Sequence, residues 1–387
     1  MEKNLKEYDV LKIKKKPIHV VHIIDSAGYG GGERYILDII QNASSAFHHW
    51  VAIPSDGPLK AELDAVSVPN IVINFEKRFS IKSILTFIRF IRQIHPAIIH
   101  SHGYRSNIYG RIAAILLRKS HVCTVHVSLY DYIDTPQRLR WMYMMIERVT
   151  SIASRRLICI SSAMTTDMLR LGIKPDKIIQ IPNGVDITRF HPRDNNVEIK
   201  RELGIGNSWP VIGTVGRMVT EKGQIYLIEA LAKIKKAYPG LICLLFGEGP
   251  LVLKLKDAAN HIGVSEICRF PGVQKDIEQI YPVMDLFVLP SLREPFGLVL
   301  LEAMASGIPV VASSSGGPLD FIYSGENGIL VPPKNPDALA EKIIDLLCDT
   351  LKLNDIANEG YRSARENFNV NKTVKRIEEV YLSLIKV

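Results

Sequence analysis

Two glutamates, Glu294 and Glu302, stand eight positions apart in the stretch EPFGLVLLEAMASG. Pro295 suits the first turn of a helix and Gly307 suits the position just after its end, so the spacing predicts one helix that carries both glutamates. Glu302 would then lie in an apolar part of that helix, where a carboxylate needs hydrogen-bond donors. The vicinal hydroxyl groups of a ribose are suitable donors, whereas the alternative is a capping glutamate followed by a partly exposed one.

The predicted start of the same helix offers further polar groups to a ligand. The backbone amides of Phe296, Gly297 and Leu298 would have no partners within the helix. Because a helix N-terminus also carries a partial positive charge, these amides could bind sugar or phosphate oxygens.

Two cations surround a glycine turn in GTVGRMVTEKGQ. Arg217 follows Gly216 at the end of a predicted strand, and Lys222 opens the next predicted helix. Such a pair can converge on one diphosphate, although two solvated basic residues are the alternative. A further glycine loop, LLFGEGP, ends a strand at Gly249. Together with the two glutamates, these groups indicate a nucleoside diphosphate site with carboxylates for sugar-like hydroxyls.

A second glycine-rich loop lies near the start of the chain, in IIDSAGYGGGERYILDII. Its place between a strand and a helix is typical of a phosphate-binding loop, and a tight turn without a ligand is the alternative. Glu33 stands where a dinucleotide fingerprint requires its third glycine, and no Walker lysine follows. The loop is therefore a candidate for binding a phosphate of another kind.

Strand and helix patterns alternate along the whole chain. The predicted strands of the first half lie in HVVHIID, HWVAIPS, NIVINFE, AIIHSHG, HVCTVHV, RLICIS and KIIQIPNG. Those of the second half lie in VIGTVGRM, LICLLFGEG, ICRFPGV, DLFVLPS, IPVVASS and GILVPP. Strands that are apolar on both faces belong to covered parallel sheets. We therefore expect an α/β protein with two doubly wound, Rossmann-like domains, residues 1–184 and 185–369, and ligands at the carboxyl ends of the strands.

The composition of the chain limits the classes of protein to which it can belong. The 387 residues carry a formal net charge of +8, which allows nucleic acid, an anionic membrane or a phosphorylated substrate as well as a plain solvated surface. The N-terminal stretch has no apolar segment typical of a secretory signal, and no apolar run is long enough to span a membrane. Five scattered cysteines, each in an apolar run, are expected to be buried thiols in a reduced compartment. We expect a cytoplasmic protein that binds no nucleic acid.

The motifs taken together resemble those of retaining glycosyltransferases of family 4, which have the GT-B fold with two domains facing a central cleft. The resemblance rests on GGGER, IIHSHG, TVHV, IPNGVDITRFHP, GRMVTEKG, FGEGP and EPFGLVLLEAMASGIPVVAS. It covers most of the chain except the first sixteen residues. The run of three glycines before Glu33 departs from the family's usual pattern, which leaves the register of that contact open.

The resemblance implies a role for each candidate residue. Arg217 and Lys222 correspond to the pair that binds the donor diphosphate, Glu302 to the ribose ligand and Glu294 to the carboxylate near the donor sugar. His126, at the end of CTVH, corresponds to a histidine beside that sugar. The remaining donor-binding positions are Gly31, Gly32, Gly216, Gly249, Phe296, Gly297 and Leu298. The C-terminal segment 370–387 would pack back on the first domain.

These roles imply transfer of a hexosyl or N-acetylhexosaminyl group from a nucleotide sugar to a glycan or lipid-linked glycan, as in surface polysaccharide, lipopolysaccharide or glycolipid synthesis. No D-x-D motif occurs, so we expect no metal and no cofactor. Three rivals stay open, namely a sugar-nucleotide 2-epimerase of the same fold, a dehydrogenase and a non-enzymatic binder. The stretches IRFIRQI and RLRWMYMMIERVTSIASRR combine apolar and basic residues, so attachment to the inner face of the cell membrane is a further hypothesis.

Overall fold

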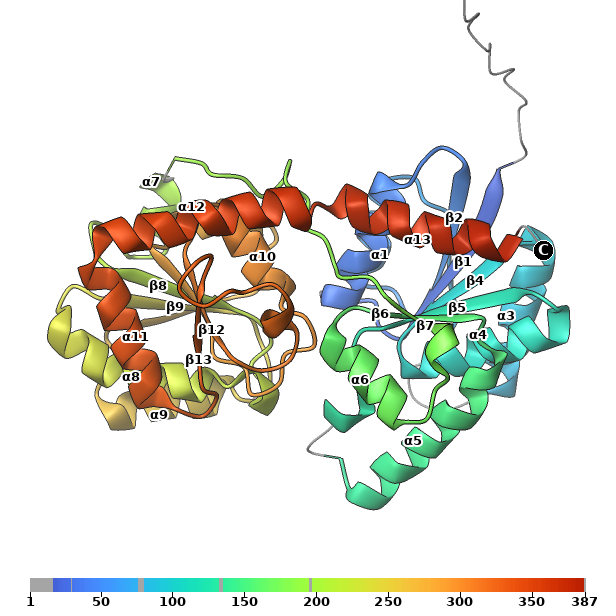
Figure 1. Ribbon diagram of the computed structural model, residues 1–387, viewed down its shortest axis with the longest axis horizontal. Coiled ribbons are helices and arrows are strands. Elements are labelled where there is room, and N and C mark those ends of the chain that lie inside the picture. Colours follow the sequence, from blue (N-terminus) through green and yellow to red (C-terminus); the bar gives the residue numbers. More distant parts are fainter. Residues whose placement is uncertain (1–16, 29, 76–79, 132–134, 195–196, 386–387) are drawn as a thin grey trace, which may run out of the picture.

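The computed structural model describes residues 17–385 except 29, 76–79, 132–134 and 195–196, and it contains two α/β domains (Figure 1). The strands of the first sheet are β1 (Ile18–Ile24), β2 (Phe47–Ile53), β3 (Asn70–Val72), β4 (Ile98–His102), β5 (Ser120–Val125), β6 (Arg156–Cys159) and β7 (Ile178–Gln180). They pair in parallel in the order β3-β2-β1-β4-β5-β6-β7. The reversal of strand order beside β1 is typical of doubly wound sheets.

The second sheet is also parallel in the described part of the chain. Its strands are β8 (Val211–Val215), β9 (Ile242–Phe246), β10 (Cys268–Gly272), β11 (Leu286–Leu289), β12 (Val310–Ser313) and β13 (Ile329–Val331), in the order β10-β9-β8-β11-β12-β13. Most residues of β8, β9, β11 and β12 are buried, because helices cover both faces. The predicted fold class of two doubly wound parallel domains is confirmed.

Helices follow most strands and form the outer layers. They are α1 (Gly31–Asn42), α2 (Pro58–Ala65), α3 (Ile81–Ile94), α4 (Tyr104–Leu117), α5 (Gln137–Thr150), α6 (Ser162–Arg170), α7 (Val197–Glu202), α8 (Gln224–Ala237), α9 (Val252–Ile262), α10 (Leu298–Ala305), α11 (Pro336–Cys348), α12 (Thr350–Asn367) and α13 (Val370–Ile385). Several begin at a side-chain cap, as where Ser80 Oγ accepts a hydrogen bond of 3.2 Å from the amide of Ser83. The predicted helix pattern of FSIKSILTFIRFIRQI is thereby confirmed.

The last two helices connect the domains. Figure 1 shows α12 lying over the second domain and α13 lying over the first. Apolar residues of α13 recur every three or four positions, and Val374, Ile377 and Tyr381 are buried in the same core as Val20 of β1 and Tyr35 of α1. The C-terminal segment therefore contributes to the core of the N-terminal domain.

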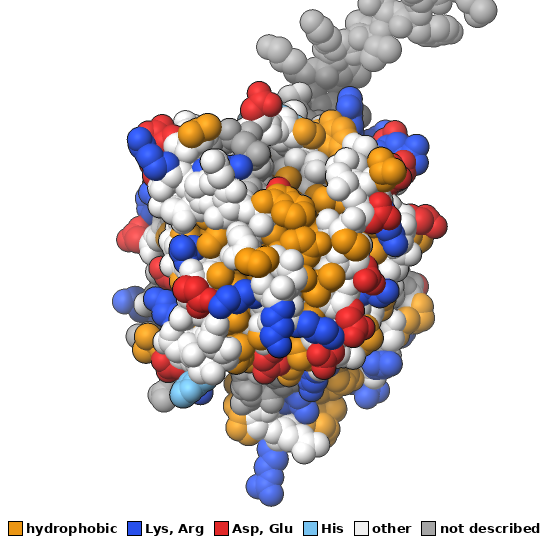
Figure 2. Space-filling view, turned by 90° about the vertical axis from the view of Figure 1, so that its left-hand side faces the viewer, with side chains coloured by type: hydrophobic (Ala, Val, Ile, Leu, Met, Phe, Trp, Pro, Cys, Tyr) orange, Lys and Arg blue, Asp and Glu red, His pale blue; other side chains and the backbone are white. Residues whose placement is uncertain are grey.

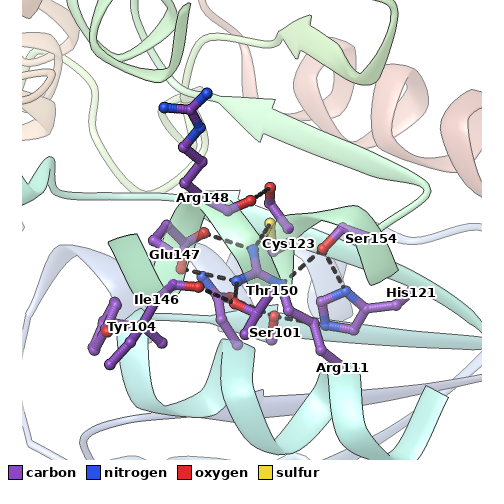
Figure 3. Close-up of polar contacts among 12 residues, drawn as sticks. Ser101, Tyr104, Arg111, His121, Cys123, Ile146, Glu147, Arg148, Thr150 and Ser154 are labelled. Carbon is purple, nitrogen blue, oxygen red and sulfur yellow. Dashed lines mark hydrogen bonds and ion pairs between the residues drawn. The ribbon is translucent and has the colours of Figure 1, made fainter. Parts of the chain in front are cut away.

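Helix α5 is attached to α4 by a buried ion pair. Arg111 on α4 donates hydrogen bonds of 2.6 and 2.9 Å to the two carboxylate oxygens of Glu147 on α5. The same guanidinium donates to Ser154 and Thr150, so its polar groups are satisfied in the core (Figure 3). Burial acts to lower the pKa of Arg111, but the neighbouring Glu147 carboxylate outweighs it and raises that pKa, so the guanidinium stays charged. The orientation of α5 is fixed by this network.

Charges on the surface of the second domain are mixed. Figure 2 shows basic and acidic side chains interspersed over its outer end. Lys233 on α8 pairs with Glu341 of α11 at 3.0 Å, and Lys235 pairs with Glu266. The net positive charge is therefore not gathered into one patch on this face.

One expectation about the cysteines is wrong. Cys123, Cys159, Cys243 and Cys268 are buried free thiols, but Cys348 is exposed. Cys348 is the last residue of α11. The apolar face of that helix packs inward through the buried Leu346 and Leu347, and Cys348 lies outside this face. Among the described helices, none is both long and apolar enough to cross a membrane.

Candidate functional site

The loops that follow β8 and β11 meet at an ion pair. Lys222 lies in a short 3₁₀ turn after β8, and its Nζ is 2.7 Å from Glu294 Oε2. Ser291 Oγ donates a second hydrogen bond of 2.9 Å to the same oxygen. Glu294 is 6% exposed, so these contacts compensate the burial of its charge. The fold thus brings together a lysine and a glutamate that are 72 positions apart.

Arg217 lies on the same loop but is exposed. Its carbonyl accepts a hydrogen bond of 2.9 Å from Gln224 Nε2, which ties the loop to the start of α8. Among the described residues, none forms a hydrogen bond or ion pair with the Arg217 side chain. The Arg217 side chain is therefore exposed to solvent, on the loop that also leads to Lys222.

The predicted helix start at Pro295 is wrong. Helix α10 begins at Leu298, and its N-cap is Gly297 with φ of 95°, a left-handed conformation that favours glycine. Glu294 and Phe296 consequently lie in the loop before the helix, and only Glu302 lies on it. The first amides of α10 remain without intrahelical partners, as at any helix start.

This loop is held in place by a glycine pair that the sequence analysis did not single out. The amide of Gly317 donates a hydrogen bond of 2.8 Å to the carbonyl of Glu294. A Cβ atom on Gly316 would lie 2.1 Å from that carbonyl oxygen, and one on Gly317 would lie 2.2 Å from Phe296 Cα. Ser161 of the first domain donates to the carbonyl of Pro295 at 2.7 Å. Both domains therefore position the loop that carries Glu294.

Glu302 is buried on α10, and Tyr281 donates a hydrogen bond of 2.7 Å to its Oε2. Burial raises the pKa of the Glu302 carboxyl, whereas Tyr281, Arg189 and Arg34 act in the opposite direction. Arg189 itself is paired with Glu278 at 2.9 Å. The carboxylate that was predicted to bind ribose thus lies close to a cation from each domain.

Glycines after β8 and β9 allow two loops to pack on each other. A Cβ atom on Gly249 would lie 2.4 Å from the carbonyl oxygen of Met218, and one on Gly247 would lie 2.1 Å from that of Gly216. The amide of Met218 donates to the carbonyl of Glu248 at 2.8 Å. Close packing thus accounts for glycine at 249 without a ligand.

The first domain contributes the start of α1 and the end of β5. A Cβ atom on Gly31 would meet open space, and one on Gly32 would lie 3.9 Å from Cδ2 of His126. His126 packs edge-on against Tyr35, with ring centroids 4.8 Å apart, and its Nε2 lies 3.2 Å from His102 Nδ1. Burial lowers the pKa of His126 to about 4, so the ring is neutral at neutral pH.

Helix α1 also carries an ion pair that sequence reasoning missed. Arg34 lies 2.7 Å from Asp38, and the charges of both residues interact with that of Glu302 in the second domain. Burial and the nearby charge of Glu302 raise the pKa of Asp38 to about 7, although Arg34 opposes this. The signal for Arg34 and Asp38 was their spacing of four on one helix face directly after the glycine loop.

Comparison with known proteins identifies the class. Residues 29–189 match the model of Glycosyltransferase Family 4, and residues 195–363 match that of Glycosyl transferases group 1. The chain therefore belongs to the family 4 glycosyltransferases with the GT-B fold.

Individual relatives span most of the chain. An Escherichia coli UDP-Gal:alpha-D-GlcNAc-diphosphoundecaprenol alpha-1,3-galactosyltransferase is 28% identical over 85% of this chain and 87% of its own. An uncharacterized glycosyltransferase of Methanocaldococcus jannaschii is 30% identical over 73% and 74%. The crystal structure of Anabaena HepE in complex with UDP and glucose has a TM-score of 0.86 and 25% identity, covering 95% of this chain and all of that one.

Proposed function

We propose that this glycosyltransferase moves a hexosyl or N-acetylhexosaminyl group from a nucleoside diphosphate sugar to a hydroxyl acceptor, with retention at the anomeric carbon and without a metal ion. The observation that carries the proposal is the Lys222–Glu294 pair of 2.7 Å at the carboxyl ends of β8 and β11, beside the helix that bears buried Glu302. It supplies one cation for a diphosphate and carboxylates for sugar and ribose hydroxyls at one place.

The chemistry follows from the charges present. The bond between the anomeric carbon and the donor phosphate breaks, and a bond from the acceptor oxygen forms on the same face of the sugar. The acceptor's proton passes to the departing phosphate oxygen. Arg217, Lys222 and the amides at the start of α10 would stabilise the charge that develops on the diphosphate.

Nucleotide binding is supported by two features of the described residues. Tyr281 occupies Oε2 of Glu302, and no described residue donates a hydrogen bond to Oε1, so that oxygen is available to a ribose hydroxyl. At the start of α1, packing within the protein does not require glycine at Gly31 or Gly32. We infer that these positions are small because the donor diphosphate approaches them.

The relatives suggest the substrates. HepE has been crystallised with UDP and with UDP-glucose, which favours a uridine nucleotide. The Escherichia coli relative is named for transfer from UDP-Gal to a diphosphoundecaprenol-linked sugar in α linkage. We therefore propose a lipid-linked glycan acceptor and a role in surface polysaccharide or lipopolysaccharide synthesis in the cytoplasm.

A thermal-shift panel of UDP-, GDP- and ADP-sugars tests the donor site. We expect UDP-sugars to raise the melting temperature, with and without EDTA, because Arg217, Lys222 and amides neutralise the diphosphate. Stabilisation that EDTA abolishes would show that a metal is required. Incubation with donor alone tests the epimerase alternative, since an epimerase converts the donor sugar without an acceptor.

Attachment to an anionic membrane surface is a separate proposal, and its best support is α5. Outward-facing Trp141, Met142 and Val149 are 64, 43 and 59% exposed, and Arg138 and Arg148 are exposed on the same side. The opposite side of the helix carries the buried Glu147 network (Figure 3). In contrast, the apolar residues of IRFIRQI on α3 pack inward, so that stretch offers chiefly arginines.

Flotation with vesicles tests this surface. We expect the full chain to bind phosphatidylglycerol vesicles at low salt, and Arg138→Glu with Arg148→Glu to abolish binding. Lys254→Glu, at an exposed position on α9 of the other domain, is the control and should not change binding. Absence of binding by the wild type at low salt would refute the proposal.

A further inference from the structure

Five histidines lie on one face of the first sheet, beneath α1 and α13. His22 of β1 is in register with His100 of β4, and His102 is two residues further along the same strand. His49 of β2 is in register with Val20, on the same side as His22, and His126 follows β5. Alternation along strands directs these side chains to the same face.

Four of the rings form a continuous hydrogen-bonded chain. His49 Nδ1 lies 2.9 Å from His22 Nε2, and His22 Nδ1 lies 3.0 Å from His102 Nε2. His102 Nδ1 in turn lies 3.2 Å from Nε2 of His126, the histidine predicted to lie beside the donor sugar. His22 and His102 are 0 and 2% exposed, so water does not compete for these bonds.

Each ring in this chain is neutral, because burial lowers the pKa of all four. A neutral imidazole has one N–H and one acceptor nitrogen. A ring that accepts a hydrogen bond from one neighbour must therefore donate to the other, so all the bonds run in the same direction. Two arrangements satisfy all three bonds. In one, His49 donates first and His126 accepts at Nε2. In the other, every direction is reversed.

The surroundings of His49, at one end of the hydrogen-bonded row of rings, distinguish the two arrangements. His49 Nε2 is buried and has no hydrogen-bond partner among the described residues. The reversed arrangement would place an N–H on that atom, and a buried N–H without an acceptor is rare in proteins. The first arrangement leaves only a lone pair there, and His126 then carries its proton on Nδ1.

We propose that His49, His22 and His102 are positioning residues that hold His126 as the Nδ1–H tautomer, with its ring fixed so that Nδ1–H can donate to an oxygen of the bound donor sugar. The second half of this statement rests on the proposed function, whereas the tautomer belongs to the free protein. His100 stands outside the chain, because its nitrogens are engaged by Tyr381 at 2.6 Å and Thr124 at 2.8 Å.

A buried metal ion is the competing explanation. Nitrogens of His22, His100 and His102 all lie within 4.8 Å of one another, as three ligands of one ion would. Against this, both nitrogens of each ring already have hydrogen-bond partners, which a metal would have to displace. Stoichiometric zinc or another transition metal in the purified full chain would overturn the proposal.

The test is long-range ¹H–¹⁵N NMR of the full chain labelled with ¹⁵N-histidine, in the absence of substrate. His126 is assigned from the signal lost in His126→Gln, and we expect its Nε2 to be unprotonated and its Nδ1 protonated. In His102→Leu the donor to Nε2 is lost, so His126 should shift toward the Nε2–H form that free imidazole side chains prefer. His102→Asn keeps an N–H near the position of Nδ1 and should restore the Nδ1–H form.

Two further results separate this role from packing alone. His49→Leu should keep the Nδ1–H form of His126, because the reversed arrangement would leave a buried N–H on His22 Nε2 without an acceptor. His49→Asp, whose carboxylate can only accept from His22 Nε2, should reverse all the bonds and give the Nε2–H form of His126, and it serves if His102→Leu does not fold. In kinetics, His102→Leu should lower kcat about tenfold with little change in the KM of the acceptor, and His102→Asn should lose less. An Nε2–H tautomer of His126 in the wild type would refute the proposal, as would an Nδ1–H tautomer that neither His102→Leu nor His49→Asp alters. The tautomer result stands whether or not the proposed transfer reaction is found.

Discussion

At the scale of single residues, the contact with most consequence is the ion pair of Lys222 with Glu294. A bound diphosphate must share Lys222 with this carboxylate, whereas Arg217 is exposed and its side chain forms no hydrogen bond or ion pair with a described residue. Arg217 is thus available for the ligand, and its replacement should not disturb the fold.

Arg217→Ala is therefore expected to lower kcat by about 10²–10³, the usual loss when one charge-stabilising group is removed. Its melting temperature should match that of the wild type. Lys254→Ala, another exposed basic residue, should retain full activity. A kcat of Arg217→Ala near that of the wild type would exclude Arg217 from the reaction.

Calorimetry should distinguish the roles of Glu294 and Glu302. Glu302→Ala should weaken both UDP and the whole donor, because each lost hydrogen bond to a charged group is worth about 1.5–3 kcal/mol. Glu294→Ala should leave UDP affinity unchanged or higher, because Lys222 is released for the diphosphate, and should chiefly lower kcat. If Glu294→Ala weakens UDP as much as Glu302→Ala does, the two roles are assigned wrongly.

At the scale of elements, β-branched runs predicted the strands of both sheets because such strands are buried on both faces. The start of α10 was mispredicted, because local preference placed Pro295 in the first turn whereas contacts with Gly316 and Gly317 hold that segment as a loop. Those contacts come from a distant part of the chain, as does the pairing of Lys222 with Glu294.

The histidine chain had a partial signal in the sequence. His100 and His102 alternate in IIHSHG, which places both on one face of a strand. Their contact with His22 and His49 depends on the order β2-β1-β4, which a strand pattern does not specify. The predicted roles of the site residues and the predicted domain boundaries remain predictions.

The attachment of α5 yields a stability prediction. Arg111→Met should lower the free energy of unfolding by about 3–5 kcal/mol, because it leaves the buried carboxylate of Glu147 without its partner (Figure 3). Arg201→Met, in the exposed pair with Glu198 on α7, should cost less than about 1 kcal/mol. Chemical denaturation of the two variants measures the difference, and equal losses would contradict the burial argument.

At the scale of the whole molecule, the buried histidines make stability depend on pH. Burial lowers the pKa of His49 from 6.5 to about 4 in the folded protein. Below pH 6.5 the unfolded chain therefore binds a proton that the folded chain does not, so stability is lost as the pH falls from 6.5 toward 4. Asp38, whose pKa is raised to about 7, acts in the opposite direction, so a comparison of variants is needed.

His49→Leu should therefore lose less stability than the wild type between pH 7 and pH 5, by about 2 kcal/mol. The control is His261→Leu, because His261 is exposed on α9 and should leave the pH dependence unchanged. Denaturation curves at the two pH values give the comparison. Equal pH dependence in the wild type and His49→Leu would mean that His49 is not buried as a neutral ring.

The central claim is that the two domains together carry out retaining transfer from a nucleotide sugar. Its most direct test is NMR of the product formed by the full chain from a UDP-hexose and a GlcNAc-diphosphate-lipid acceptor in EDTA. Because the donor sugar is α-linked, we expect the new glycosidic bond to show the small anomeric coupling of an α linkage, with release of one UDP per bond formed. A β-linked product, or a reaction that proceeds only after a metal ion is restored, would contradict the account.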